Sequence, residues 1–240
     1  DRMDYLNRDS FFTGVSEGRA TMSVVNADGS VPEMCGNGLR CVALHLVRRG
    51  LVEGRAFEVD TDAGPHACVV HEVSAPGRVE VAMRAPSLAP GEVPVVAAEP
   101  LLDAPLETGG SRVRWTAFSM GTPHAVTFDA LGEKRLEVGP ALQRDARFPA
   151  GVNVGFARVL GAGHIELAVL ERGAGWTEAC GTGACAAAVA AVRTGRASAG
   201  QTLRVTLPAG DLEIVVGAAE EPVRMIGPAR HVFVGKLDAI

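Results

Sequence analysis

A cysteine followed by Gly-x-Gly and then by a long apolar run constrains this chain more than any other feature. The pattern occurs where Cys180 precedes Gly-Thr-Gly and a run of alanine and valine that extends to Val192. Such a run predicts a helix with the cysteine at its N-terminus. Backbone N–H groups and the helix macrodipole stabilise negative charge there, so we expect a lowered pKa and an available thiolate at Cys180.

The same pattern occurs 145 residues earlier in the chain. Cys35 precedes Gly-Asn-Gly and an apolar run, and Arg48, Arg49 and Gly50 follow. These residues predict a second helix with a basic last turn and a glycine at its C-terminal end. Both helices are apolar nearly all round, which predicts that each is buried inside a sheet.

The residues around the two cysteines also repeat. Each helix is preceded by a strand-like run and followed by a strand that ends in a turn: ATMSVVN at 20–26, IELAVLE at 165–171, VDTDAG at 59–64 and VTLPAG at 205–210. A strand, turn, cysteine, helix and strand that occur twice indicate two homologous domains related by a pseudo-twofold axis. The second repeat has many more residues ahead of its cysteine than the first, so we expect a strand and loop of the first to be absent from this sequence.

The segment 87–110 separates the repeats and is rich in proline, glycine and alanine, which is typical of a linker. We therefore divide the chain into an N-terminal half, residues 1–90 with 228–240, and a C-terminal half, residues 91–227. In the tail, VRMIGPARHVFVGKL, we expect two short strands interrupted at Gly227-Pro228.

Composition narrows the class of function. With 240 residues and 47% hydrophobic content, the chain can bury one large core or two small ones. Its net charge of −5 gives no reason to expect nucleic acid or an anionic membrane as a partner, and no apolar run approaches the ~20 residues that span a bilayer. The five cysteines contain no CxxC pair, which argues against a metal site or a disulfide framework. No signal peptide is visible, so we expect a cytoplasmic protein with reduced thiols and a small-molecule partner.

Two thiols on opposite sides of one cleft suit a reaction that removes a proton from one face of a carbon and returns it to the other face. One sulfur acts as thiolate base and the other as thiol acid. The N–H groups of Gly-Asn-Gly and Gly-Thr-Gly can bind a substrate carboxylate and stabilise its growing charge. Near Cys180, Glu171 can orient groups or accept protons and Arg172 can bind a carboxylate; Asn26 occupies the position equivalent to Glu171 in the first repeat.

Four segments resemble the diaminopimelate epimerases, a family of cofactor-independent amino-acid epimerases. They are NADGSVPEMCGNGLRC at 26–41, SMGTPH at 119–124, VNVGF at 152–156 and ERGAGWTEACGTGAC at 171–185. The resemblance implies an α/β fold of two pseudosymmetric domains, each a curled mixed or antiparallel sheet around a central buried helix, with the active site between them. It implies an isomerase that converts LL-diaminopimelate to meso-diaminopimelate for lysine and peptidoglycan precursor synthesis, without pyridoxal phosphate or metal.

The same resemblance assigns roles to individual residues. Cys35 would be the base and Cys180 the acid, with Glu171 and His124 beside the cysteines. The substrate would be bound by the two helix starts and by ligands of its distal end, which are Gly36, Asn37, Gly38, Gly181, Thr182 and Gly183, with Asn26, Asn153 and Arg172. The remaining thiols, Cys41, Cys68 and Cys185, are expected to be structural.

The sequence departs from the family pattern at several positions. Thr122 replaces an asparagine, Gly155 and Trp176 each replace a glutamate, and the family's N-terminal motif is missing. Two alternatives therefore stay open, a related racemase for another amino acid and a catalytically inactive homologue. A homodimer also stays open. In a substrate-free cleft, we expect Cys35 and Cys180 to be able to form a disulfide that abolishes activity.

Overall fold

The computed structural model describes residues 10–16, 19–26, 29 and 31–233. The chain forms two compact units. The described residues of the N-terminal unit lie within 9–81 and 226–240, and those of the C-terminal unit lie within 82–225. The homologous halves predicted from the sequence, 1–90 with 228–240 and 91–227, remain a prediction, because compactness alone does not test homology.

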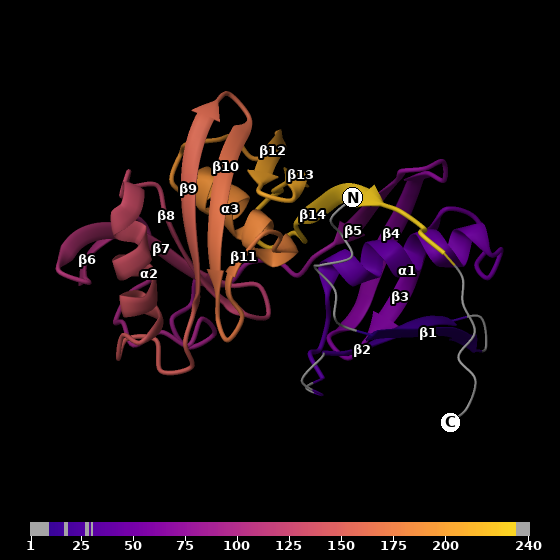
Figure 1. The fold of residues 1–240 in the computed structure, drawn as a ribbon, viewed down its shortest axis with the longest axis horizontal. Helices are drawn as coiled ribbons and strands as arrows, with labels where there is room; N and C mark the ends of the chain where they lie inside the picture. Colours follow the sequence, from indigo (N-terminus) through magenta and orange to yellow (C-terminus); the bar gives the residue numbers. More distant parts are fainter. Residues whose placement is uncertain (1–9, 17–18, 27–28, 30, 234–240) are drawn as a thin grey trace. The chain divides into compact units, whose positions relative to one another are not determined.

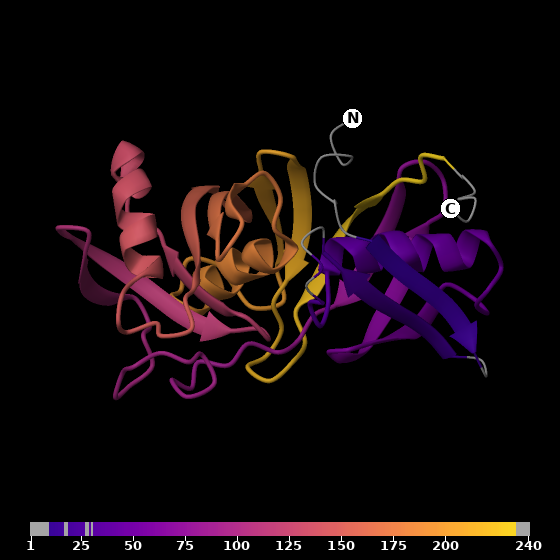
Figure 2. The ribbon, with the colours of Figure 1, turned by 60° about the horizontal axis from the view of Figure 1, so that its bottom comes forward.

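The N-terminal unit is a sheet that carries one helix. Its strands follow the order β1-β2-β3-β4-β5-β14. Helix α1 connects β2 to β3, which run parallel, and it lies along one face of the sheet (Figure 1 and Figure 2). The bounds are β1 (Ser10–Ser16), β2 (Arg19–Val25), α1 (Gly36–Arg48), β3 (Ala56–Thr61), β4 (Gly64–Glu72), β5 (Gly77–Ala82) and β14 (Arg224–Ala229).

The C-terminal unit has a larger sheet and two α-helices. Its strands follow the order β13-β12-β10-β9-β8-β7-β6, and β11 pairs with β10. The strands are β6 (Ala104–Thr108), β7 (Ser111–Ser119), β8 (Pro123–Thr127), β9 (Asn153–Gly161), β10 (His164–Glu171), β11 (Gly175–Thr177), β12 (Thr202–Leu207) and β13 (Gly210–Val215). The helices are the 3-10 turn η2 (Gly132–Lys134), α2 (Arg135–Gln143) and α3 (Gly181–Arg193).

Helix α3 forms the centre of the C-terminal unit. Ten of its 13 residues are buried, as its alanine-rich sequence predicts. Val169 and Leu170 are neighbours in β10 and therefore point to opposite faces of the sheet. A Cβ atom on Gly183 of α3 would lie 3.0 Å from Val169, and one on Gly139 of α2 would lie 3.0 Å from Leu170. The two helices thus cover opposite faces of the same strand, α3 on the inner face and α2 on the outer face (Figure 1).

The other helix, α1, is less enclosed than expected. Its residues His45, Val47 and Arg48 are only partly buried, so the predicted burial on all sides holds for α3 and not for α1. Neither helix is of membrane-spanning length and apolarity, and the same is true of every other helix in the described part of the chain.

Both cysteine helices end in the same way. Gly50 and Gly195 follow them with φ of 64° and 72°, a left-handed conformation that favours glycine. The N–H of the next residue, Leu51 or Arg196, then donates to the carbonyl five residues earlier, at 2.9 and 2.8 Å. This pattern is a Schellman-type C-terminus in both units. The predicted glycine end of the first helix is confirmed, and the second helix ends in the same way.

The strands around the helices share one register. In the N-terminal unit Ala20 pairs with Val59 in the parallel β2–β3 ladder. In the C-terminal unit Ile165 pairs with Val205 in the parallel β10–β12 ladder. Ile165 lies 145 residues after Ala20, and Val205 lies 146 residues after Val59. The two repeats therefore pair their strands at corresponding residues.

Two sequence expectations are wrong. The segment 87–110 is not a linker, because Val93 and Val95 are buried in the core of the C-terminal unit and β6 lies within it. Its prolines and glycines limit regular structure but do not keep its valines in solvent. The tail does not break at Gly227-Pro228 either, since β14 runs through both residues; the fixed φ of proline is compatible with an extended strand. The end of the predicted second strand, 234–237, lies outside the described residues.

We predict that Ala187→Leu lowers the free energy of unfolding by about 1–3 kcal/mol, because a larger side chain overpacks a filled core. Ala187 is 0% exposed in the middle of α3. Denaturant unfolding followed by tryptophan fluorescence measures the change. Ala199→Leu, in an exposed turn after α3, is the control and should change stability by less than about 0.5 kcal/mol. Equal stability of both variants would show that α3 is not enclosed.

Candidate active site

Cys180 is the N-cap residue of α3. Its backbone is extended, with φ −138° and ψ 107°, and its Sγ accepts a hydrogen bond from the Gly183 N–H at 3.3 Å. The Thr182 hydroxyl lies 3.5 Å from the same sulfur. A Cβ atom on Gly183 would lie 3.1 Å from Sγ and 3.0 Å from Val169, so a glycine is needed for the helix to begin this close to the cysteine. The thiol is 5% exposed.

Cys35 caps α1 in the same manner in the N-terminal unit. Its φ of −131° and ψ of 111° match those of Cys180 closely, and its Sγ accepts from the Gly38 N–H at 3.5 Å. The prediction that each cysteine stands at a helix N-terminus is therefore confirmed. The two repeats present their sulfurs with one geometry.

The expected lowering of the pKa at Cys180 is wrong. Burial raises the pKa of the Cys180 thiol, and the negative charge of Glu171, whose carboxylate also accepts a hydrogen bond from the thiol, raises it further. The hydrogen bonds from Thr182 and Gly183 lower this pKa, but burial outweighs them. Cys180 is consequently a neutral thiol near neutral pH, which is the protonation state of a general acid.

Glu171 and Arg172 lie where β10 ends. Glu171 pairs with Gly175 of β11 and shares the α3 face of β10 with Val169, which brings its carboxylate to Cys180. The backbone N–H of Arg172 donates to Asn153 Oδ1 at 2.8 Å, and its Nη1 donates to the Ala150 carbonyl at 2.6 Å. Arg172 is therefore held at its backbone and at its guanidinium group.

His124 stands in β8 opposite Asn153 of β9. Its imidazole is buried, stacks on Phe118 with ring centroids 6.3 Å apart, and has Nε2 3.1 Å from the Thr122 hydroxyl. Burial and the positive charge of Arg172 lower the pKa of His124 to about 4. The imidazole is thus neutral at physiological pH and can donate or accept one hydrogen bond without carrying charge.

The N-terminal unit places its predicted site residues at two points. Gly36, Asn37 and Gly38 form the first turn of α1 after Cys35. The Asn37 side-chain oxygen is buried and has no hydrogen-bond partner in the structure, so it is an acceptor that a ligand donor could satisfy. Asn26 follows β2, and its carbonyl accepts a hydrogen bond from the Gly29 N–H at 2.9 Å.

The other three cysteines behave as structural residues. Cys68 and Cys185 are buried and Cys41 is partly buried. Burial raises the pKa of Cys68 to about 12 and raises that of Cys41 as well. Within the described part of the chain, histidine, cysteine and acidic side chains form no cluster of three that could hold a metal ion.

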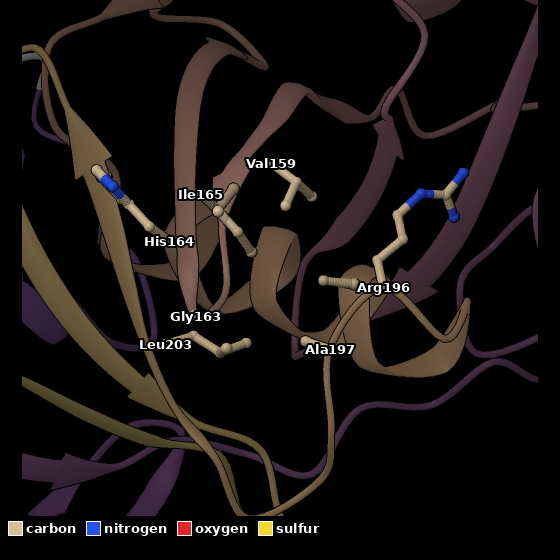
Figure 3. Close-up of a pocket in the computed structure, with 9 residues that line it drawn as sticks. Val159, Gly163, His164, Ile165, Arg196, Ala197 and Leu203 are labelled. Carbon is tan, nitrogen blue, oxygen red and sulfur yellow. The ribbon is translucent and has the colours of Figure 1, made fainter.

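Two recesses of the C-terminal unit lie away from these residues. One is a cavity of about 10 Å³ between β10, β12 and the end of α3, lined by residues that include Ile165 and Leu203 (Figure 3). The other is an open recess of about 400 Å³ lined by Phe128, Arg158, Val159 and Arg196. Neither is lined by Cys180 or by the residues that contact it, and the smaller has room for about one water molecule.

Sequence reasoning missed two contacts of this region. The hydroxyl of Thr122 faces His124, and the side chain of Arg84 lies against Gly121 in the turn before β8. The first could have been found from the i, i+2 spacing at the start of a strand. The second joins residues from distant parts of the chain, and nothing in the local sequence of Arg84 indicates it.

The solved structures that resemble this chain show its fold. A probable proline racemase of Agrobacterium radiobacter matches with a TM-score of 0.68 and 17% identity, over 97% of this chain and 75% of that protein. A hydroxyproline epimerase of Agrobacterium vitis matches with a TM-score of 0.63 and 18% identity, over 92% and 71%. The α/β fold class inferred from the sequence is confirmed, with a mixed sheet as the dominant element and few helices.

Sequence comparisons identify the family. The diaminopimelate epimerase family model matches residues 7–88 and 116–232. The diaminopimelate epimerase of Moorella thermoacetica is 44% identical over 225 residues, which cover 91% of this chain and 79% of the relative. Those of Stutzerimonas stutzeri and Synechocystis are 42% and 41% identical, over 89% and 91% of this chain and 76% and 78% of the relatives. The match spans both cysteine motifs, and the chain belongs to the diaminopimelate epimerase family.

Proposed function

We propose that this protein is an isomerase that inverts the α-carbon of LL-diaminopimelate to give meso-diaminopimelate, a step in lysine and peptidoglycan precursor synthesis. The observation that carries the proposal is the matched geometry of Cys35 and Cys180, each capping a helix start with its sulfur. The relatives that bear the name diaminopimelate epimerase support the substrate.

The proposed chemistry moves one proton at each face of the α-carbon. The Cys35 thiolate takes the α-proton, so the C–H bond breaks and its electrons remain on the substrate as a carbanion. The Cys180 thiol then gives its proton to the opposite face and becomes a thiolate, which hydrogen bonds from Gly183 and Thr182 stabilise. The resting state returns when Cys180 regains a proton and Cys35 loses one, with the Glu171 carboxylate adjacent to Cys180 for this exchange.

The helix starts supply the α-carboxylate site in this proposal. The first intrahelical hydrogen bonds are made by Leu39 in α1 and Ala184 in α3. The N–H groups of Gly38 and Gly183 donate to the cysteine sulfurs. The N–H groups of the first two residues of each helix have no acceptor within the helix, so in this proposal these four groups bind the carboxylate. They belong to Gly36, Asn37, Gly181 and Thr182. The partnerless Asn37 oxygen would accept from the substrate ammonium group.

The distal end of the substrate would be bound by Asn26, Asn153 and Arg172. Arg172 supplies a positive charge for the distal carboxylate. The side-chain oxygen of Asn153 positions Arg172 by accepting a hydrogen bond from its backbone N–H. The neutral His124 would contribute a hydrogen bond and no charge. We further propose a cytoplasmic location, because the mechanism requires both cysteines to stay reduced.

A second candidate is a racemase of the same mechanism for another amino acid. It is favoured by one observation, that the Thr122 hydroxyl is directed at His124. Threonine at this position also lacks the side-chain amide of the family pattern, so the preferred amino acid could differ at its distal end.

We predict that Cys35→Ala and Cys180→Ala each abolish epimerisation, with kcat lowered by about 10²–10⁴-fold, because each removes one of the two proton-transfer groups. In D₂O, each variant should still exchange the α-proton of one stereoisomer slowly, and the stereoisomer should differ between the two variants. NMR measures the deuteration. Cys41→Ala is the control and should retain activity. Epimerisation by either variant at the wild-type rate would contradict the two-cysteine mechanism, and exchange only with another amino acid would favour the second candidate.

We predict opposite shifts of the Cys180 pKa in two variants. Glu171→Gln removes a negative charge and should move the pH profile of Cys180 alkylation to lower pH. Thr182→Val removes a hydrogen bond that stabilises the thiolate and should move it to higher pH. Iodoacetamide labelling at a series of pH values, quantified for the Cys180 peptide by mass spectrometry, measures both. Glu166→Gln, on the same strand and paired with Arg158, should leave the profile in place. Shifts of the same sign in the first two variants would refute this account of the thiol.

We predict that mild oxidation of the substrate-free protein joins Cys35 to Cys180 and abolishes activity, because the proposal brings both sulfurs to one carbon. Dithiothreitol should restore activity. Peptide mapping identifies the disulfide, and bound substrate should protect against it. A disulfide that forms instead between other cysteines, with Cys35 and Cys180 still reduced, would show that the two sulfurs do not meet.

A further inference from the structure

The side chain of Gln143 joins two strands of the C-terminal unit. Gln143 is the last residue of α2, and its Nε2 donates to the carbonyls of Val152 and Leu170, at 3.2 Å each. A side-chain amide has two N–H donors, so one residue satisfies both carbonyls. Val152 directly precedes β9, and Leu170 is the last residue but one of β10. The glutamine therefore links the start of one strand to the end of its neighbour.

This link lies where the ladder between the two strands ends. At this end of the sheet, the antiparallel β9–β10 register stops at the pair of Val154 with Leu170. Just beyond that pair, the side-chain oxygen of Asn153 accepts a hydrogen bond from the backbone N–H of Arg172 at 2.8 Å. The amide of Gln143 is a second side-chain connection at the same place. Side-chain hydrogen bonds thus hold the strands together past the end of the ladder.

The two carbonyls belong to peptide planes that carry predicted site residues. A peptide unit is planar, so the carbonyl oxygen of one residue and the Cα atom of the next residue lie in one rigid plane. The Leu170 carbonyl therefore shares a plane with the Cα atom of Glu171. The Val152 carbonyl shares a plane with the Cα atom of Asn153 in the same way. A hydrogen bond to each oxygen restricts rotation of these planes, and so it fixes the directions in which the two side chains leave the backbone.

The packing of α2 on the sheet holds the glutamine in place. Gly139 precedes Gln143 by four residues and lies on the same face of the helix. A Cβ atom on Gly139 would lie 3.0 Å from Leu170 and 3.2 Å from Phe156, so α2 lies close against the sheet here. Helix α2 covers the outer face of β10, whereas α3, which Cys180 caps, covers the inner face (Figure 1). Gln143 therefore reaches the strand ends from the face of the sheet opposite the thiol.

The position of Glu171 can be read from the thiol that it faces. The negative charge of Glu171 and its hydrogen bond both raise the pKa of Cys180. Both effects weaken when the carboxylate moves away, because the interaction between charges falls with distance. A rotation of the peptide plane before Glu171 should therefore change how Cys180 titrates, even though Gln143 lies on the other face of the sheet.

We propose that Gln143 is a positioning residue of the active site, which sets the directions of the Glu171 and Asn153 side chains through the peptide planes that precede them. The inference rests on the proposed function, because it supports residues that would act on the same substrate. In this proposal Gln143 contacts neither the substrate nor the reacting atoms.

The experiment removes the two donors and keeps the length of the side chain. In Gln143→Met, the pH profile of Cys180 alkylation by iodoacetamide should move to lower pH, in the direction expected for Glu171→Gln. In Glu171→Gln/Gln143→Met, no further shift should occur, because the carboxylate that Gln143 positions is absent. In turnover assays, kcat/KM of Gln143→Met should fall by about tenfold, since a misplacement of about 1 Å can cost about 10²-fold.

Gln201→Met is the matched control. Gln201 is the other glutamine of the chain, is also half-buried, and accepts a hydrogen bond from the Ser198 N–H in the turn before β12. Its replacement should leave the alkylation profile and kcat/KM unchanged.

A wild-type alkylation profile in Gln143→Met, or a wild-type kcat/KM in an active enzyme, would overturn the inference. An equal further shift in Glu171→Gln/Gln143→Met would also overturn it, because loosened burial of Cys180 and not the position of the carboxylate would then be the cause. Alkylation needs no substrate. If the protein does not epimerise diaminopimelate but Gln143→Met shows the expected shift, the proposed function is refuted and the positioning role stands.

Discussion

The hydrogen bond from a backbone N–H to a cysteine sulfur at the start of a helix determines where chemistry can occur in this fold. In each unit the third residue of the helix donates to the capping cysteine. The bond requires glycine at Gly183, where a Cβ atom would press on the sulfur and on Val169. The N–H groups of the first two helical residues are left facing outward beside the sulfur. Burial of the helix thereby places a thiol beside the N–H groups that, in the proposed function, bind the substrate carboxylate.

The balance between burial and the helix terminus explains why Cys180 is a thiol. A helix N-terminus typically stabilises a negative charge by about 0.3–1 kcal/mol, which is less than one pKa unit, about 1.36 kcal/mol. Full burial can shift a pKa in the opposite sense by up to about 3–5 units. Because Cys180 is only 5% exposed, the rise in its pKa that burial causes is larger than the fall that the helix terminus causes. The sequence predicts the helix terminus but not the degree of burial of the thiol. It therefore predicts the wrong direction for the shift of the Cys180 pKa.

Local patterns revealed much of the fold and of the site. The two cysteine turns, their helices and the strands before and after each helix followed from segments that repeat, whereas the parallel pairing of those strands did not. Helix α2 could not be found in this way, because Gly139 and Pro140 in its middle are helix breakers in isolation and their place is stabilised by packing on Leu170. The burial of Val93 in the core could not be predicted either, because the surrounding segment is rich in proline and lacks a strand or helix pattern. Contacts such as Arg84 on Gly121 depend on register between distant strands, which no local pattern encodes.

The duplication gives two cysteines one backbone geometry, yet the proposed chemistry needs them in different protonation states. The residues that differ between the repeats must therefore supply the difference. At the end of β10 stands Glu171, whose charge raises the pKa of Cys180. The repeat places Asn26 at the equivalent position after β2, and an amide carries no charge. One repeat thus has a carboxylate that adds to the effect of burial in raising the pKa of its sulfur, and the other has a neutral side chain in its place. In the proposed mechanism, burial and this carboxylate together keep Cys180 an acid, whereas the position equivalent to Glu171 in the first repeat carries no charge.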